Sequence, residues 1–371
     1  MPDAPRSTPA SGSALPIIGV VGAGVMGSGI AQLALEAGHE VVLHDVDDDA
    51  LDRGTDRIAD GLARRAAKLL ADPDSIDDWV EGRISRLRRS DVLESLGDEA
   101  DVVIEAALES LELKRTIFGT LDGVADPGTI LATNTSALPI GAIAAATAHP
   151  ERVVGLHFFN PAPVMRLVEV VAGPRTADAV AERAARLVES WGRTPVRAAD
   201  APGFIVNRVN RPFTIEALRI LEEGVATVEQ IDEAMRVAGY PLGPFELQDL
   251  TGIDVTHAAA TAIWEGLGRP DRLRPSPIQA ERIEAGALGR KTGIGFHRYE
   301  GGRRVGPAEP FDRAPTPLAA DAIRSRIEAA IGAEARRAVD EGIASESDVD
   351  LALRLGAGHP HGPFEADSAR S

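Results

Sequence analysis

The sequence predicts an α/β fold, in which a doubly wound parallel sheet is followed by an all-α domain with a partial second copy. Short apolar runs alternate with helical patterns up to about residue 200, which is typical of a parallel sheet with helices on both faces. A breaker cluster, 200–203, then gives way to an almost entirely helical pattern. Finally, the block 223–246 recurs in part at 341–365, which indicates an internal repeat.

A glycine-rich turn follows the first apolar run, 17–21, and opens a helical stretch. A strand, such a turn and a helix in this order are typical of dinucleotide sites in Rossmann-type sheets. The first glycine allows the tight turn, the second lets the backbone approach a pyrophosphate, and the third lets the helix pack closely on the strand. The helix N-terminus faces the phosphates. The predicted cofactor-binding residues of this turn are Gly22, Gly24, Val25, Met26 and Gly27.

The second predicted strand, 41–44, ends at Asp45, where a carboxylate is expected to hold the ribose hydroxyls. The residues that follow, 46–49, include no arginine that could hold a 2′-phosphate. The sequence therefore predicts NAD rather than NADP as cofactor.

Later elements follow in order. Helices are expected at 47–70, 110–124, 204–223, 228–238, 245–264 and 276–286, and strands at 101–104, 129–133, 153–156 and 168–171. The expected domains are a disordered tail (1–13), a Rossmann-type NAD-binding domain (14–200), a helical domain (201–299), a linker (300–317) and a truncated repeat of the helical domain (318–371).

Composition narrows the class of protein. A net charge of −18 over 371 residues argues against a nucleic-acid partner and against an anionic membrane surface. No apolar run is long enough for a membrane span, and residues 1–13 lack the apolar core of a signal peptide, so we expect a cytoplasmic protein. No cluster of His, Asp and Glu has metal-ligand spacing, so no metal is predicted.

His157 follows an apolar run, and Glu169 lies in the next predicted strand, with a Pro-x-Pro segment between them. A carboxylate on one ring nitrogen of a histidine fixes the tautomer and makes the other nitrogen more basic. The pair therefore predicts a general base that takes the proton of an alcohol while its carbon loses hydride to NAD⁺.

Several stretches together resemble the L-3-hydroxyacyl-CoA dehydrogenases over about 15–299. They are Ala132-Thr133-Asn134-Thr135-Ser136, His157-Phe158-Phe159-Asn160-Pro161 with Glu169, and Pro202-Gly203-Phe204-Ile205-Val206-Asn207-Arg208. The resemblance implies the oxidation of an L-3-hydroxyacyl-CoA to the 3-oxoacyl thioester with NAD. It makes His157 the catalytic base and Glu169 its partner.

The resemblance also implies further site residues. Ser136 would hydrogen-bond the 3-oxygen of the substrate, and Asn207 would order the substrate and the catalytic groups. Lys68 would lie near the CoA phosphates. The remaining implied NAD contacts, beside Asp45 and the glycine turn, are Glu109, Lys114, Asn160 and Lys291. Lys68, Lys114 and Lys291 are the chain's three lysines, so each falls on a ligand position of the family.

Two other readings stay open from the sequence. The same chemistry could act on an acyl-carrier-protein thioester or on a free hydroxy acid of the gulonate or carnitine type. In another class, the chain could be a non-catalytic NAD-binding protein of the crystallin type, although the full set of catalytic positions argues against that.

The repeat lacks a counterpart of the asparagine in 202–208, so it cannot form a second active site. Its apolar positions Ile323, Ile327, Ile331, Ala335 and Val339 recur at helical spacing and need a surface to pack on. We expect the repeat to pack on the first helical domain of the same chain, where a partner subunit would sit in a one-copy relative. The protein is then either a homodimer or a pseudo-dimeric monomer.

Overall fold

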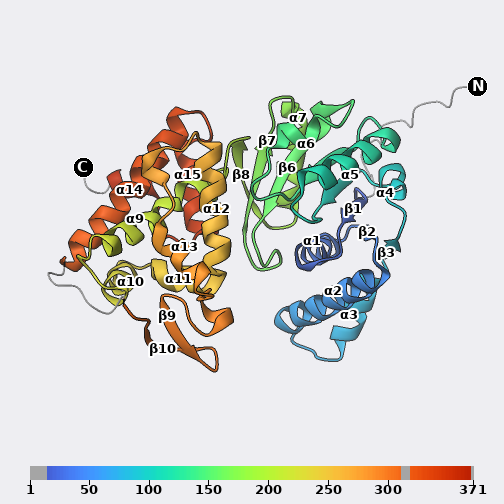
Figure 1. Cartoon of the computed structure of the whole chain (residues 1–371). Coiled ribbons are helices and arrows are strands. Elements are labelled where there is room, and N and C mark those ends of the chain that lie inside the picture. The colour runs from blue at the N-terminus through green and yellow to red at the C-terminus, as the bar shows by residue number, and fades with distance from the viewer. Residues whose placement is uncertain (1–14, 311–317, 369–371) are drawn as a thin grey trace, which may run out of the picture. The chain divides into compact units, whose positions relative to one another are not determined.

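The computed structural model of the chain describes residues 15–310 and 318–368 (Figure 1), so the tail expected at 1–13 lies outside the described residues. The described chain belongs to two compact units. Among the described residues, the first comprises 15–135, 142–164 and 175–193, and the second 136–141, 165–174, 194–310 and 318–368.

The first unit alternates strands and helices, as predicted. Its elements are β1 (Ile18–Val21), α1 (Val25–Glu36), β2 (Val41–His44), α2 (Asp48–Leu69), α3 (Ser75–Ile84), β3 (Leu87–Ser90), α4 (Glu94–Glu99), β4 (Val102–Glu105), α5 (Leu111–Val124), β5 (Ile130–Thr133), β6 (Val153–Phe158) and α7 (Asp178–Ser190), with a short 3-10 turn at Pro150–Arg152. The short helix α6 (Ile140–Ala144) spans the border of the two units.

The strands form a mainly parallel sheet in the order β3-β2-β1-β4-β5-β6-β7-β8, which confirms the predicted α/β class. β1 lies between β2 and β4, and both pairings are parallel. In this register Val21 is opposite His44 on one side and Glu105 on the other. The segments that follow these strands therefore leave the sheet at one edge, as expected for a ligand site in an open α/β sheet.

The second unit contains the last two strands and the helices. Its elements are β7 (Leu167–Ala172), β8 (Thr194–Ala199), α8 (Val206–Val209), α9 (Arg211–Glu222), α10 (Val228–Val237), α11 (Pro244–Thr251), α12 (Ile253–Gly266), α13 (Pro277–Glu284), β9 (His297–Glu300), β10 (Arg303–Pro307), α14 (Ala320–Asp340), α15 (Glu346–Gly356) and α16 (Pro363–Ser368), with 3-10 turns at Asp271–Leu273 and Arg290–Thr292. The all-α prediction is right except for the β9–β10 hairpin.

Three predicted elements differ from the structure. The helix expected over 245–264 is split into α11 and α12 at Gly252, whose φ of 103° a helix cannot contain. The helix expected over 204–223 is split at Asn210, because Pro212, in the first turn of α9, has no N–H to continue the hydrogen bonding of α8. The linker expected over 300–317 contains β10, and its residues 311–317 lie outside the described part of the chain.

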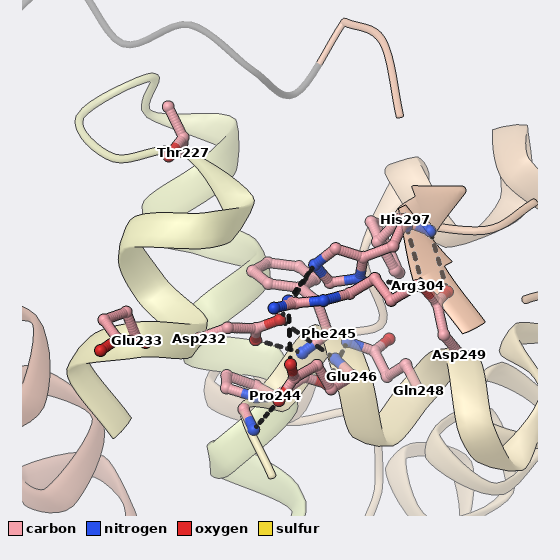
Figure 2. A network of polar contacts seen from close by, with 12 residues as sticks. Thr227, Asp232, Glu233, Pro244, Phe245, Glu246, Gln248, Asp249, His297 and Arg304 are labelled. Atoms are coloured by element: carbon pink, nitrogen blue, oxygen red, sulfur yellow. Dashed lines mark hydrogen bonds and ion pairs between the residues drawn. The ribbon is translucent and has the colours of Figure 1, made fainter. Parts of the chain in front are cut away.

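A buried polar network fixes α10, α11 and the hairpin to one another (Figure 2). The ring nitrogens of His297 lie 3.3 Å from Asp232 and 3.1 Å from Asp249. Both carboxylates and the imidazole are buried. Asp249 also accepts hydrogen bonds from the backbone N–H groups of Phe296 and His297, both at 2.8 Å. Since each polar group has partners, the network holds the hairpin without an unsatisfied buried charge.

The repeat packs on the first helical domain, as expected, with α14 lying against α9 and α10. Ile323, Ile327, Ile331 and Ala335 are buried in this contact. At the end of the stripe the buried residue is Ala338 rather than Val339, because a helix of 3.6 residues per turn drifts from a strict four-residue spacing. Arg326 of α14 makes ion pairs with Glu216 of α9 and with Glu223.

Candidate functional site

The glycine turn has the geometry that a pyrophosphate needs. Gly22 has φ of 99°, and a Cβ there would lie 2.7 Å from the carbonyl oxygen of Ala106. A Cβ on Gly27 would lie 1.8 Å from the carbonyl oxygen of Gly22, so only glycine lets the helix approach the turn. A Cβ on Gly24 would meet nothing within 4 Å. Gly24 is exposed, and Val25 beside it is 60% exposed, so the turn has open space at the start of α1 for the phosphates of a dinucleotide.

Asp45 lies directly beside this turn. Its Oδ2 accepts a hydrogen bond from the backbone N–H of Ala23 at 2.8 Å, and its Oδ1 accepts one from Asp47 at 3.2 Å. The carboxylate is only partly buried. It is thus held in place next to the phosphate-binding turn, where a ribose with two free hydroxyls fits and a 2′-phosphate would be repelled.

Lys114 forms ion pairs with Glu105, at the end of β4, and with Glu109, which follows that strand. The Nζ of Lys114 lies 2.7 and 2.9 Å from the two carboxylate oxygens of Glu105, and both side chains are buried. The same Nζ lies 3.3 Å from Glu109, whose other oxygen accepts a 2.6 Å hydrogen bond from Thr135. Lys114 therefore fixes Glu109, whose side chain is 40% exposed and can meet a ligand.

Glu105 is not among the site residues predicted from the sequence, although it is a partner of Lys114. In the structure Glu105 also accepts hydrogen bonds from Thr133 and from the backbone of Ala107, both at 2.7 Å. The sequence signal for this ion pair was a carboxylate at the end of an apolar run, followed nine positions later by a lysine. A charge fully inside a sheet needs such a partner.

The predicted base, His157, lies in β6 and is buried, with its ring 4.4 Å from that of Phe159. The next residue, Phe158, donates its backbone N–H to the side-chain oxygen of Asn134 at 2.8 Å, which joins the ends of β5 and β6. Asn160 follows on the surface. His157 and Asn160 belong to the first unit.

Glu169, Ser136 and Asn207 belong to the second unit. Glu169 is fully buried in β7, and its Oε1 accepts hydrogen bonds from the backbone N–H groups of Ile205 and Val206 at 3.0 and 2.8 Å. The side-chain amide of Asn207 donates to the carbonyl oxygen of Ser136 at 3.5 Å. The motif 202–208 therefore supplies both the donors to Glu169 and the asparagine beside Ser136.

The other two lysines are Lys68 in the first unit and Lys291 in the second. Lys68 is exposed in the last turn of α2. Lys291, in the second unit, contacts both carboxylate oxygens of Asp254 at 2.6 and 2.7 Å, and this hydrogen bonding lowers the pKa of Asp254. Both ammonium groups are accessible to an anionic ligand.

The described residues contain neither a candidate metal site nor a membrane-spanning helix. Within 15–310 and 318–368, no group of three or more His, Cys, Asp or Glu side chains is placed to hold a metal ion. No helix of that same part of the chain has the length and apolarity needed to cross a membrane.

Models of known protein families match both the N-terminal and the C-terminal part of the chain. The family model described as "3-hydroxyacyl-CoA dehydrogenase, NAD binding domain" matches residues 17–201. The model described as "3-hydroxyacyl-CoA dehydrogenase, C-terminal domain" matches 203–299 and again 323–367. The second model thus covers both the helical domain and its repeat.

Two similar sequences are the 3-hydroxyadipyl-CoA dehydrogenase of Escherichia coli and a probable 3-hydroxybutyryl-CoA dehydrogenase of Bacillus subtilis. The first is 46% identical over 78% of this chain, a match that spans 60% of its own length. The second is 44% identical over 76% of this chain and 96% of its own length. Among solved structures, the 3-hydroxybutyryl-CoA dehydrogenase of E. coli K12 matches with a TM-score of 0.86 at 35% identity, covering 97% of this chain and 92% of that one. The chain belongs to the 3-hydroxyacyl-CoA dehydrogenase family.

Proposed function

We propose that the protein oxidises an L-3-hydroxyacyl-CoA to the 3-oxoacyl-CoA, with NAD⁺ as the hydride acceptor. The observation that carries this proposal is that the family's NAD-binding and C-terminal models match successive halves of one chain. The geometry of the glycine turn and of Asp45 supports the choice of cofactor, because the turn is open at Gly24 and the carboxylate stands beside it.

In this proposal His157 takes the proton of the 3-hydroxyl group as the C–H bonding electrons leave as hydride and the C–O bond becomes double. Bound NAD⁺ supplies the acceptor for that hydride. Glu169 carries the charge that favours the protonated imidazole. Its two backbone donors fix the orientation of its carboxylate.

Ser136 is proposed to donate to the 3-oxygen, and Asn207 to order the substrate beside it. The cofactor-binding residues are proposed as Asp45, Glu109 and Asn160, with Lys114 acting through Glu109 because its own side chain is only 1% exposed. Lys291 is proposed as a further contact with the cofactor. Lys68 is proposed to bind the phosphates of CoA, since its ammonium group is exposed.

The test is a substrate panel read by the absorbance of NADH. The panel contains short, medium and dicarboxylic 3-hydroxyacyl-CoAs of both configurations at C3. They are compared with the matching N-acetylcysteamine and acyl-carrier-protein thioesters and with the free hydroxy acids. We expect NADH from the L-hydroxyacyl-CoAs. Activity confined to carrier-protein thioesters or to free acids would refute CoA as the carrier, and no activity with any substrate would refute the reaction.

Lys68→Ala provides an internal check on the carrier. Because N-acetylcysteamine has no phosphates, the substitution should raise KM for the CoA thioester and leave KM for the short thioester unchanged. An exposed ion pair is typically worth up to about 1 kcal/mol, so a severalfold rise in KM is expected. Equal changes with both thioesters would contradict the proposed role of Lys68.

Mass measurement in solution distinguishes the two alternatives predicted for the oligomeric state, a homodimer and a pseudo-dimeric monomer. The cytoplasmic location remains a prediction from the sequence.

A further inference from the structure

The segment 205–210 connects the proposed active site with the repeat. Its first two backbone N–H groups, of Ile205 and Val206, donate to Glu169. Its third residue, Asn207, donates to the carbonyl oxygen of Ser136. A shift of this short segment would therefore move the donors of Glu169 and the side chain of Asn207 together.

The next residue, Arg208, is fully buried and is held by two carboxylates of the repeat. Its Nε donates to Glu334 at 2.9 Å, and its two terminal nitrogens donate to Glu341 at 2.7 and 2.9 Å. The hydrogen bond from Arg208 lowers the pKa of Glu341. Because a buried guanidinium is costly without partners, these bonds fix the position of the segment strongly.

The repeat also makes two uncharged contacts with the segment 205–210. The side-chain oxygen of Asn210 lies 2.8 Å from Nε2 of His359. Gly356, at the end of α15, is packed so closely that a Cβ there would lie 2.6 Å from Leu167 and 2.9 Å from Val206. Leu167 is in β7, two residues before Glu169. The repeat thus supports both the strand and the segment that hold this carboxylate.

We propose that the repeat is a positioning element of the active site, in which Glu341, Glu334 and Gly356 fix the segment that holds Glu169 and Asn207. This inference rests on the proposed function for the roles of those two residues. It assigns Glu341 and Gly356 a part in the reaction although neither touches the substrate.

The test compares Glu341→Gln with Glu223→Gln in the full-length protein. Each variant removes one carboxylate that forms a two-pronged ion pair across the contact between the copies, to Arg208 or to Arg326. The two carboxylates are also equally exposed, at 47% and 48%. Only Glu341 is bonded to the segment 205–210, so Glu223→Gln is the matched control.

We expect both variants to lower the melting temperature, Glu341→Gln by more because its partner Arg208 is buried and Arg326 is not, and only Glu341→Gln to lower kcat. With kcat expressed per NADH-binding site, the expected loss of kcat is about tenfold, because small misplacements of catalytic groups have large effects on the rate. KM for NAD should stay unchanged. With weaker backbone donors, Glu169 should hold the proton of His157 more firmly, so the acid limb of the pH profile should move to higher pH. Glu341→Asp, which keeps the charge, should restore part of kcat.

A second measurement does not depend on activity. Hydrogen exchange at the amides of Ile205 and Val206 should become faster in Glu341→Gln and stay as in the unmodified protein in Glu223→Gln. Gly356→Ala, which presses on Val206 without removing a charge, should also speed this exchange and lower kcat. Equal kcat and equal exchange in the Glu341 and Glu223 variants would overturn the proposal.

Faster exchange in a protein that oxidises no 3-hydroxyacyl thioester would leave the positioning contact standing and refute the proposed function instead.

Discussion

Asp232 and Asp350 make the same hydrogen bonds at corresponding places in the helical domain and in its repeat. Each carboxylate accepts from two successive backbone N–H groups in the first turn of a later helix, at 2.9 and 3.2 Å for Asp232 and 2.9 and 3.1 Å for Asp350. The donors are Phe245 and Glu246 of α11, and Phe364 and Glu365 of α16. First-turn N–H groups have no partner within their own helix, so each aspartate completes a helix start.

The burial of the two aspartates predicts different effects of their removal. Asp232 is fully buried and Asp350 is 8% exposed, and burial raises the pKa of both carboxyl groups. Asp232→Ala should lower the free energy of unfolding by about 2–4 kcal/mol, because two N–H groups lose their acceptor away from water. Asp350→Ala should have a smaller effect. Urea unfolding measures both.

Asp232→Asn serves as the control, because it keeps one acceptor oxygen and should lose less than Asp232→Ala. If Asp350→Ala destabilised the protein as much as Asp232→Ala, the burial argument would be wrong.

Removal of the proposed base should abolish most of the turnover. His157→Ala should lower kcat by about 10²–10⁴-fold, which is the usual contribution of a general base. Binding of NADH, followed by fluorescence titration, should be unchanged. Glu169→Gln should lower kcat and move the acid limb of the pH profile to lower pH, because the imidazole loses its charged partner. Near-normal turnover in His157→Ala would refute the mechanism.

Asp45 should decide the choice between NAD and NADP. Its carboxylate is held beside the glycine turn by the N–H of Ala23, so it should accept from ribose hydroxyls and repel a 2′-phosphate. Asp45→Ala should raise KM for NAD and lower KM for NADP, so that the ratio of kcat/KM for NAD to kcat/KM for NADP falls. Asp47→Ala, an exposed acid two residues later, should change this ratio little. A protein that preferred NADP before any substitution would contradict the assignment.

The cofactor-binding turn could be predicted because its requirements are local. Gly22 and Gly27 are needed where a Cβ would come within 3 Å of other backbone atoms, and such glycines fall at fixed spacing. The repeat was visible for the same reason, since Asp232 and Asp350 serve helix starts at nearly the same distance along the chain, 13 and 14 residues later. Local sequence and local geometry agree at both places.

The partners of Arg208 and the strand β3 could not be predicted, because the first depend on residues far away in the chain and the second has only a weak sequence pattern. Arg208 is paired with residues more than a hundred positions away, and nothing in its own segment indicates which carboxylates they are. β3 is a short strand rich in arginine and serine at the edge of the sheet, so it shows no apolar run. Edge strands of this kind look like loops in a sequence.

Lys114 should not tolerate arginine. Its ammonium group is buried between Glu105 and Glu109, and the larger planar guanidinium has no room there although the charge is the same. Lys114→Arg should displace Glu109 and weaken NAD binding about tenfold, the effect of one lost charge-assisted hydrogen bond. Calorimetric titration with NADH measures this change. Arg115→Lys, at the exposed neighbouring position, is the control and should bind normally.

Stability should fall as the pH drops, in part because of His359. Burial and the nearby His361 lower the pKa of His359 to about 3. In the unfolded chain a histidine has its ordinary pKa of about 6.5, so between about pH 6.5 and 3 the unfolded state binds a proton that the folded state does not. Stability is therefore highest above about pH 6.5 and falls below it, by up to about 1.4 kcal/mol per pH unit from this group.

The stabilising contributions of Glu341 and Glu223, whose pKa values are lowered by their arginine partners, are lost only at pH values below the window from about pH 6.5 to 5. Burial also lowers the pKa of His39 and raises that of Asp232, so the contribution of His359 in this window is obtained by comparing variants. In that window the free energy of unfolding of His359→Gln, measured with urea, should vary less steeply with pH than that of the unmodified protein. His149→Gln, at a histidine that is 59% exposed, should leave the slope unchanged. An equally steep slope in His359→Gln would show that this imidazole binds its proton as readily in the folded protein as in the unfolded chain.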